Sequence, residues 1–450
     1  MRSFAPLLSL ALLCAACDPK PPAAATSSSD VTPPSAPSAI PSAPADSSAP
    51  VDTAKPVDPV APPAPGDLGG LAKSNNALAV DLYAKARAQA GNLALSPISI
   101  STALTMTWGG ARGETAAQMK KVLHAEGDAD KAMDVSGKLV ASFGGADSKV
   151  TLRVANRLFG EKTYSFEQAY LDRTKAAFGA PLEGLDFKHA FDPSRIHINE
   201  WVAKQTQDRI KDLIPKGGVN AETRLVLTNA IYFLGDWMSP FKKESTRPAP
   251  FHATASASSD VPTMNQTAHF RFAATDGVKL LELPYEGGEV AMLFALPDAP
   301  AGLDAVEKRL STEAIDKWVS ALQHENVIVA LPKFEINPAQ SLALGDTLKA
   351  LGMPLAFDPA KADFTLIANP PSPADRLYIS QVFHKAFVKL DEKGTEAAAA
   401  TAVVMARAGA AAPSKPPSEF KADHPFLFFL RHVRSGAILF MGRVSDPAAK

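Results

Sequence analysis

The stretch LVLTNAIYFLGDW, residues 225–237, decides the fold of this chain. Its first nine residues, 225–233, form a β-rich run bounded by a nearby glycine, so they predict a strand. Residues 290–296 and 327–336 are further β-rich runs bounded by Gly or Pro. Near the C-terminus, residues 425–444 predict a β-hairpin that turns at residues 434–436.

Helical patterns precede these strands in the chain. Apolar residues recur at helical spacing over residues 78–86, and Asn75 and Asn76 are candidate N-terminal caps for that helix. Two more helices are predicted, one around residues 119–123 and one over residues 196–210. Helices first and strands later predict a mixed α+β domain with large antiparallel sheets.

The composition excludes several classes of function. The chain has 450 residues, 21% charged residues and a net charge of -1, which argues against nucleic acid as a partner because phosphate binding needs a basic face. Its nine histidines are scattered without ligand spacing, and its two cysteines, Cys14 and Cys17, both precede the folded part. We therefore expect no metal, no cofactor and no disulfide in the folded domain.

The first seventeen residues predict a signal peptide. Arg2 is followed by a short apolar run over residues 7–13, which is too short to span a bilayer. Residues 14–17, Cys-Ala-Ala-Cys, resemble a bacterial lipobox in which Cys17 is lipidated, although Cys14 replaces the usual Leu. The sequence favours an extracytoplasmic lipoprotein, periplasmic or on the cell surface, whose only membrane contact is the lipid. Ordinary secretion is the alternative.

Residues 18–70 are rich in Pro, Ala and Ser with almost no large apolar residues. Such a segment cannot bury enough surface to offset its ordering entropy, so we expect a disordered tether. Residues 71–450 contain no second linker and predict one large domain.

Several segments, in order along the chain, resemble the serpin family of protease inhibitors. Residues 92–104 with 110–115 resemble the family's second helix and the turn after it, and residues 228–241 resemble the third strand of its main sheet. Three short motifs follow in family order: LPKF at 331–334, HKA at 384–386 and FKADHPF at 420–426. The resemblance extends from about residue 75 to residue 447.

The resemblance implies a serpin fold, with three β-sheets, about eight to nine helices and an exposed reactive-centre loop, in a monomer. It also implies a function as a suicide inhibitor of serine-type endopeptidases. A target protease attacks the loop and forms an acyl-enzyme. The cleaved loop then enters the main sheet as a new strand and distorts the protease before water hydrolyses the ester. The serpin is consumed in this reaction, so the resemblance implies an inhibitor and not an enzyme.

The segment that carries this mechanism is DEKGTEAAAATAVVMARAG, residues 391–409. From composition alone it could be an ordinary helix or a loop, because alanine is the best helix former. The family resemblance identifies it as the reactive-centre loop. Its hinge residues by this resemblance are Glu392, Gly394, Thr395, Ala397, Ala398, Ala399 and Ala400.

An inserting strand must bury every second side chain without burying an unpaired charge. The residues expected to face inward are Thr395, Ala397, Ala399, Thr401, Val403 and Met405. They contain no charge and no proline, which favours an inhibitor over a non-inhibitory binding or carrier serpin.

Counting seventeen residues from Glu392, as in the family, places the attacked bond between Ala408 and Gly409. Alanine there suits an elastase-like or subtilisin-like protease. A loop used one residue short would present Arg407 to a trypsin-like protease, and Met405 is a further alternative.

Other family positions match individual residues of this chain. Trp237 matches the aromatic residue at the loop's entry point, and Lys333 and Glu392 match a pair expected to form a salt bridge at the hinge. The polar cluster beneath the main sheet, which governs its opening, is matched by Ser96, Ser99, Asn229 and His384.

The absence of known catalytic motifs from the sequence argues against an enzyme. The sequence contains no G-x-S-x-G elbow, no H-E-x-x-H helix and no phosphate-binding loop.

Overall fold

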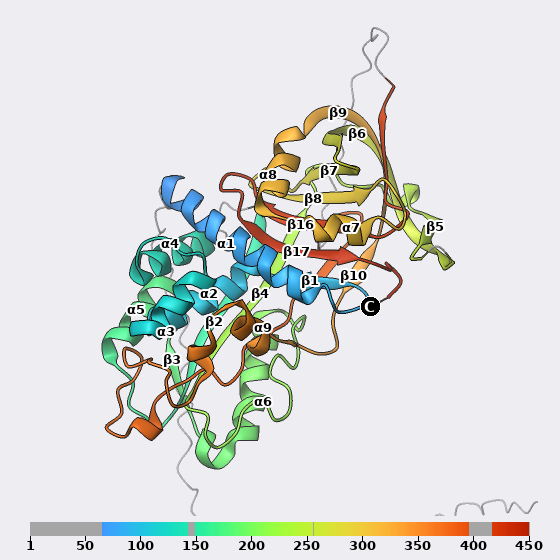
Figure 1. Cartoon of the computed structure of the whole chain (residues 1–450). Coiled ribbons are helices and arrows are strands. Elements are labelled where there is room, and N and C mark those ends of the chain that lie inside the picture. The colour runs from blue at the N-terminus through green and yellow to red at the C-terminus, as the bar shows by residue number, and fades with distance from the viewer. Residues whose placement is uncertain (1–64, 143–148, 255, 396–415, 450) are drawn as a thin grey trace, which may run out of the picture. The chain divides into compact units, whose positions relative to one another are not determined.

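The computed structural model describes residues 65–142, 149–254, 256–395 and 416–449. These residues belong to one compact unit, and they form nine α-helices and three β-sheets (Figure 1). The expected α+β class, with three sheets and eight to nine helices, is therefore confirmed. None of the helices in these ranges is long and apolar enough to cross a membrane.

The largest sheet has nine strands and contains the predicted C-terminal hairpin. Its order is β1-β17-β16-β8-β7-β6-β9-β15, and β5 pairs with β6 outside this path. The strands are β1 (Leu93–Leu95), β5 (Arg247–His252), β6 (Ser258–Thr275), β7 (Val278–Pro284), β8 (Val290–Pro297), β9 (Gln323–Pro332), β15 (Ser418–Lys421), β16 (Phe426–His432) and β17 (Ile438–Val444). Every residue of β8, β16 and β17 is buried, which explains their nearly continuous apolar sequences.

The second sheet has six strands in the order β10-β13-β14-β4-β2-β3. They are β2 (Val150–Glu161), β3 (Leu182–Leu185), β4 (Leu225–Asp236), β10 (Phe334–Ile336), β13 (Val388–Leu390) and β14 (Gly394–Thr395). The long antiparallel pair of β2 and β4 forms its centre. The predicted strand at residues 225–233 forms most of β4, whereas the run 327–336 forms two strands, β9 and β10, in different sheets. A separate pair consists of β11 (Leu342–Ala343) and β12 (Phe383–His384).

The helices are α1 (Pro65–Ala86), α2 (Pro97–Trp108), α3 (Gly113–Val122), α4 (Ala129–Ser142), α5 (Gln168–Phe178), α6 (Phe187–Gln205), α7 (Leu303–Lys308), α8 (Thr312–Ala321) and α9 (Gly345–Leu351). Helix α2 is buried along almost its whole length because it packs against both β4 and β17 (Figure 1). A short 3₁₀ helix, η1 (Lys243–Ser245), follows β4. The predicted helix at 119–123 is α3, and the one at 196–210 begins earlier and ends earlier, as α6.

Two expectations about the N-terminal end of the domain are corrected. Helix α1 begins at Pro65, inside the segment expected to be a tether, and its Leu68 is buried in the core. Asn75 and Asn76 therefore lie inside α1 and are not caps. Their amide nitrogens donate instead to the carbonyl oxygens of Ile438 (2.9 Å) and Gly436 (2.9 Å), so they fasten the start of β17 to α1.

Candidate functional site

The site centres on the strand position between β4 and β13, here called the slot. Its upper end lies at Asp236 and its lower end at Leu225. Strand β14 occupies only the upper end, because Gly394 pairs with Asp236 and Thr395 pairs with Gly235. Thr395 also pairs with Leu390 of β13. Among the described residues, β14 is the only strand that pairs with β4 on this side, so the rest of this edge of β4 has no strand partner.

Gly394 is required at the top of the slot. Its φ of +155° is one that residues with side chains rarely adopt, and a Cβ added there would lie 2.0 Å from the carbonyl oxygen of Gly235. Glycine therefore lets the chain pass close enough to β4 to enter the sheet.

Glu392 fixes the chain immediately before this entry. Its buried carboxylate accepts hydrogen bonds from Lys333 Nζ (2.9 Å) and Thr246 Oγ1 (2.8 Å), and its carbonyl oxygen accepts one from the Phe241 amide (2.8 Å). Burial alone would raise the pKa of Glu392, but the hydrogen bonds from Lys333 and Thr246 outweigh it and hold the pKa below its ordinary value. The expected pair of Lys333 and Glu392 is thus formed.

A stacked pair of aromatic side chains contacts the chain at the upper end of the slot. The Tyr285 ring stacks on Trp237 with centroids 4.3 Å apart, and its hydroxyl lies 2.5 Å from Thr395 Oγ1. Trp237 Nε1 donates to the carbonyl oxygen of Asp391 (3.1 Å), and its backbone amide donates to that of Lys393 (2.6 Å). Trp237, expected at the loop's entry point, is therefore in contact with the hinge.

Two members of the expected polar cluster, Ser96 and His384, are buried and in contact with each other. The Ser96 amide donates to His384 Nε2 (3.0 Å), and Ser96 Oγ donates to the carbonyl oxygen of Leu439 (2.8 Å). Burial lowers the pKa of His384 to about 4, so the ring is neutral at pH 7. Ser99 is buried on α2, which begins directly after Ser96, whereas the side chain of Asn229 lies outside the described part.

The structure does not describe the other predicted positions. The hinge residues Ala397, Ala398, Ala399 and Ala400, the reactive-bond candidates Met405, Arg407, Ala408 and Gly409, and the lipidation candidate Cys17 all lie outside the described residues.

Sequence reasoning missed two residues that contact the hinge. Tyr285 lies in the turn between β7 and β8, and Thr246 follows η1. Neither belongs to a motif of its own, and both are far from Thr395 and Glu392 along the chain. Only the tertiary fold brings each to its partner.

Comparison with known proteins agrees with this geometry. The family model described as "Serpin (serine protease inhibitor)" matches residues 73–447. The chain belongs to the serpin family. It is a serine protease inhibitor by family, and the part of the expected hinge that the structure describes, Gly394 and Thr395, pairs with β4 in the six-stranded sheet, which corresponds to the family's main sheet.

Individual serpins match over most of the chain. Human leukocyte elastase inhibitor is 39% identical over 387 residues, which cover 84% of this chain and 99% of that protein. A solved structure of Serpin48, described as a highly specific serpin of the insect Tenebrio molitor, covers 84% of this chain and 98% of that one, with 32% identity and a TM-score of 0.73. Human thyroxine-binding globulin, solved with its hormone, covers 85% of this chain and 100% of that one, with 26% identity and a TM-score of 0.76.

Proposed function

We propose that this serpin traps its target protease by inserting the cleaved reactive-centre loop into the slot between β4 and β13. The observation that carries the proposal is that Gly394 and Thr395 already pair with Asp236 and Gly235. A strand that begins in place needs only to extend downward along an edge of β4 that has no strand partner among the described residues.

The register at the hinge supports this proposal. Continued downward, it brings position 397 opposite Phe233, position 401 opposite Asn229 and position 405 opposite Leu225, where β4 ends. Thr395 points to the buried Tyr285, so the inward row is the one predicted from sequence. The slot therefore has room for residues 394–405 and receives only small or apolar side chains on its inner face.

The same register bears on the reactive bond. A bond after Ala408 leaves residues 406 and 407 between the end of the slot and the acylated Ala408, so the protease is carried past the edge of the sheet. A bond after Met405 would leave the protease at the lower end of the slot, still against the sheet. We propose that the protease attacks the bond between Ala408 and Gly409, with the bond after Arg407 as the alternative. We propose an elastase-like or subtilisin-like protease as the target. The similarity to leukocyte elastase inhibitors supports an elastase-like protease.

We further propose that the inhibitor acts outside the cytoplasm as a monomer. Residues 1–17 would be the signal, Cys17 the lipidated residue and the Pro-, Ala- and Ser-rich segment the tether to the membrane, with secretion as the alternative. A non-inhibitory carrier function is the second candidate, since thyroxine-binding globulin shares the fold. The intact Gly394 and the uncharged inward row favour the inhibitor.

The test is incubation of the protein with elastase, subtilisin, chymotrypsin and trypsin, followed by denaturing gel electrophoresis. We expect a band at the summed mass that survives heat and detergent, and a released C-terminal peptide that begins at Gly409. A peptide that begins at Ala408 would assign the bond to Arg407. If every protease cleaves the loop and keeps its activity without forming a complex, the trapping function is contradicted.

A further inference from the structure

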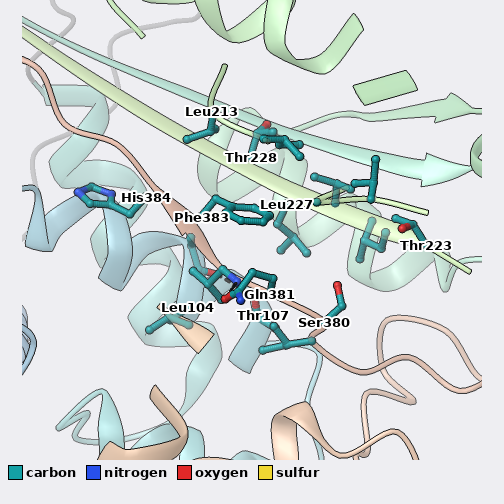
Figure 2. A pocket seen from close by; sticks show the side chains of 18 of the residues that line it. Leu104, Thr107, Leu213, Thr223, Leu227, Thr228, Ser380, Gln381, Phe383 and His384 are labelled. Carbon is teal, nitrogen blue, oxygen red and sulfur yellow. Dashed lines mark hydrogen bonds between the residues drawn. The ribbon is translucent and has the colours of Figure 1, made fainter. Parts of the chain in front are cut away.

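The lower half of the slot lies over a cavity of about 130 Å³ (Figure 2). It is lined by Leu227 of β4, Phe383 of β12, Leu104 of α2 and Leu213 of the segment after α6. Three parts of the chain that are far apart in sequence thus line one partly open, mainly apolar space. The contacts that fasten the hinge lie at the other end of the slot.

The described residues that line the cavity carry no ionised group. They include no Asp, Glu, Lys or Arg, and His384 is neutral at pH 7 because burial lowers its pKa to about 4. The threonine hydroxyls labelled in Figure 2 are engaged within the protein, and that of Thr223 accepts a hydrogen bond from the Asn220 amide (3.0 Å). Thr107 Oγ1 donates to the carbonyl oxygen of Ala103 (2.9 Å), and Thr228 Oγ1 donates to that of Arg157 (2.9 Å). The lining therefore suits a neutral, mainly apolar molecule.

The volume sets the size of that molecule. An engineered cavity of about 150 Å³ lined by Leu, Ile and Phe stays dry and binds benzene. The cavity beneath the slot has a comparable volume, about 130 Å³, and a similar set of side chains, including Leu104, Leu227 and Phe383. It can therefore hold one six-membered ring.

The same space is needed for loop insertion. In the register set by Thr395 and Gly235, position 403 comes opposite Leu227 and position 405 opposite Leu225. Both β4 residues line the cavity, so the inward side chains of Val403 and Met405 would enter it. A molecule in the cavity and an inserted loop cannot be accommodated together.

We propose that this cavity binds a neutral monocyclic aromatic molecule, and that the bound molecule keeps the lower slot closed and turns the inhibitor into a substrate. A ligand that binds only the uninserted state stabilises that state in proportion to the logarithm of its concentration over its dissociation constant. Insertion then slows while hydrolysis of the acyl-enzyme does not, so cleaved serpin accumulates and active protease is released. This second part rests on the proposed trapping function, whereas the binding itself does not.

Binding is tested directly with fluorobenzene and ¹⁹F NMR on the full chain. Ala103 of α2 is partly buried and lines the cavity, so Ala103→Leu fills it, and we expect the affinity for fluorobenzene to fall at least tenfold. Ala116→Leu is the matched control, since Ala116 is a partly buried alanine of α3 outside the cavity. If Ala103→Leu does not fold, Thr107→Ile fills the same space from the next turn of α2. No binding to the unaltered protein, or equal binding to Ala103→Leu and Ala116→Leu, would overturn the site.

Regulation is tested by the molar ratio of serpin to protease needed for full inhibition. For a protease that is trapped without ligand, saturating fluorobenzene should raise this ratio at least threefold in the unaltered protein and leave it unchanged in Ala103→Leu. Protease activity on a small peptide substrate with and without fluorobenzene serves as the control. An unchanged ratio despite ¹⁹F-detected binding would overturn the regulatory part. Absence of any trapped complex without ligand would instead contradict the proposed function and leave the binding result to stand by itself.

Discussion

The two ends of the slot differ in what holds them. At the upper end, Gly394 and Thr395 are seated in the sheet, and an ion pair and a stacked Trp–Tyr pair fasten the chain around them. At the lower end, the neighbouring edge of β4 has no strand partner among the described residues, and apolar side chains surround a cavity. The fold therefore supplies the starting point of an extra strand at one end and room for its last side chains at the other. The polar contacts at the upper end fix the position at which the loop enters the sheet. The cavity at the lower end leaves room for the last side chains that would insert.

The largest effect is expected from closing the upper end with a side chain. Gly394→Val would drive Cβ into the Gly235 carbonyl, so the hinge must leave the sheet. We expect the serpin-to-protease ratio for full inhibition to rise about tenfold or more, with the loop still cleaved. Gly70→Val is the control, because a Cβ at Gly70 in α1 meets no atom within 4 Å. Equal inhibition by Gly394→Val and the unaltered protein would contradict an obligatory start at this position.

The second prediction concerns the pH dependence of stability and His384, which lines the cavity at the lower end. The pKa of His384 is about 4 in the folded protein, below its usual value of 6.5, so the unfolded chain binds the extra proton first as the pH falls. Its contribution to stability is unaffected above pH 6.5 and declines between pH 6.5 and 4, by about 3 kcal/mol in all. Denaturant unfolding across this range should show that loss.

His384→Gln is the variant for this prediction, because the glutamine oxygen can still accept from the Ser96 amide. We expect its stability between pH 6.5 and 4 to vary less than that of the unaltered protein. His252→Gln, at an exposed site in β5, should keep the full pH dependence. A His384→Gln profile identical to that of the unaltered protein would argue against a neutral buried His384.

A smaller effect is expected from the ion pair at the hinge. Lys333→Met removes the partner of the buried Glu392 and should lower the free energy of unfolding by about 1–2 kcal/mol, less than for a fully buried pair because Lys333 is 37% exposed. The hinge should also leave the sheet more readily, which native gel electrophoresis would detect as faster polymerisation on warming. Lys389→Met is the control, since its pair with Glu335 is longer, 4.0 Å, and exposed. An equal loss of unfolding free energy in both variants would contradict a specific stabilising role for the pair of Lys333 and Glu392.

The smallest effect is expected from the hydroxyl pair of Tyr285 and Thr395. Each of Tyr285→Phe and Thr395→Val leaves one buried hydroxyl unpaired and should cost about 1 kcal/mol of stability, whereas the double variant removes both hydroxyls and should cost less than their sum. A thermodynamic cycle of unfolding measurements gives the coupling energy. Additive losses would mean that the two hydroxyls do not stabilise each other.

The sequence predicted those features that depend on local pattern or on long ordered motifs. Strand β4, the C-terminal hairpin and the pair of Lys333 and Glu392 were all predicted. The caps at Asn75 and Asn76 were predicted wrongly, because a short polar residue before an apolar repeat looks like a cap whether or not the helix has already begun. In the structure these asparagines bind backbone groups of the β16–β17 hairpin more than 350 residues away.

Features that depend on packing between distant segments could not be predicted. Tyr285 meets Thr395 across 110 positions in sequence, and no local pattern marks either residue as a partner of the other. The cavity is likewise a property of how α2, β4 and residues 377–384 fail to fill a shared volume. Periodicity shows which side chains turn inward, but not whether they fill the space they reach.

The measurement that tests the central claim most directly is the thermal unfolding midpoint before and after cleavage in the segment 396–415. If the cleaved loop continues from Thr395 down the slot, it adds a strand with new hydrogen bonds along β4 and fills the cavity beneath Leu225 and Leu227. The account predicts a midpoint well above that of the uncleaved protein. A midpoint that stays the same or falls would mean that the loop does not insert, and the trapping mechanism would be contradicted.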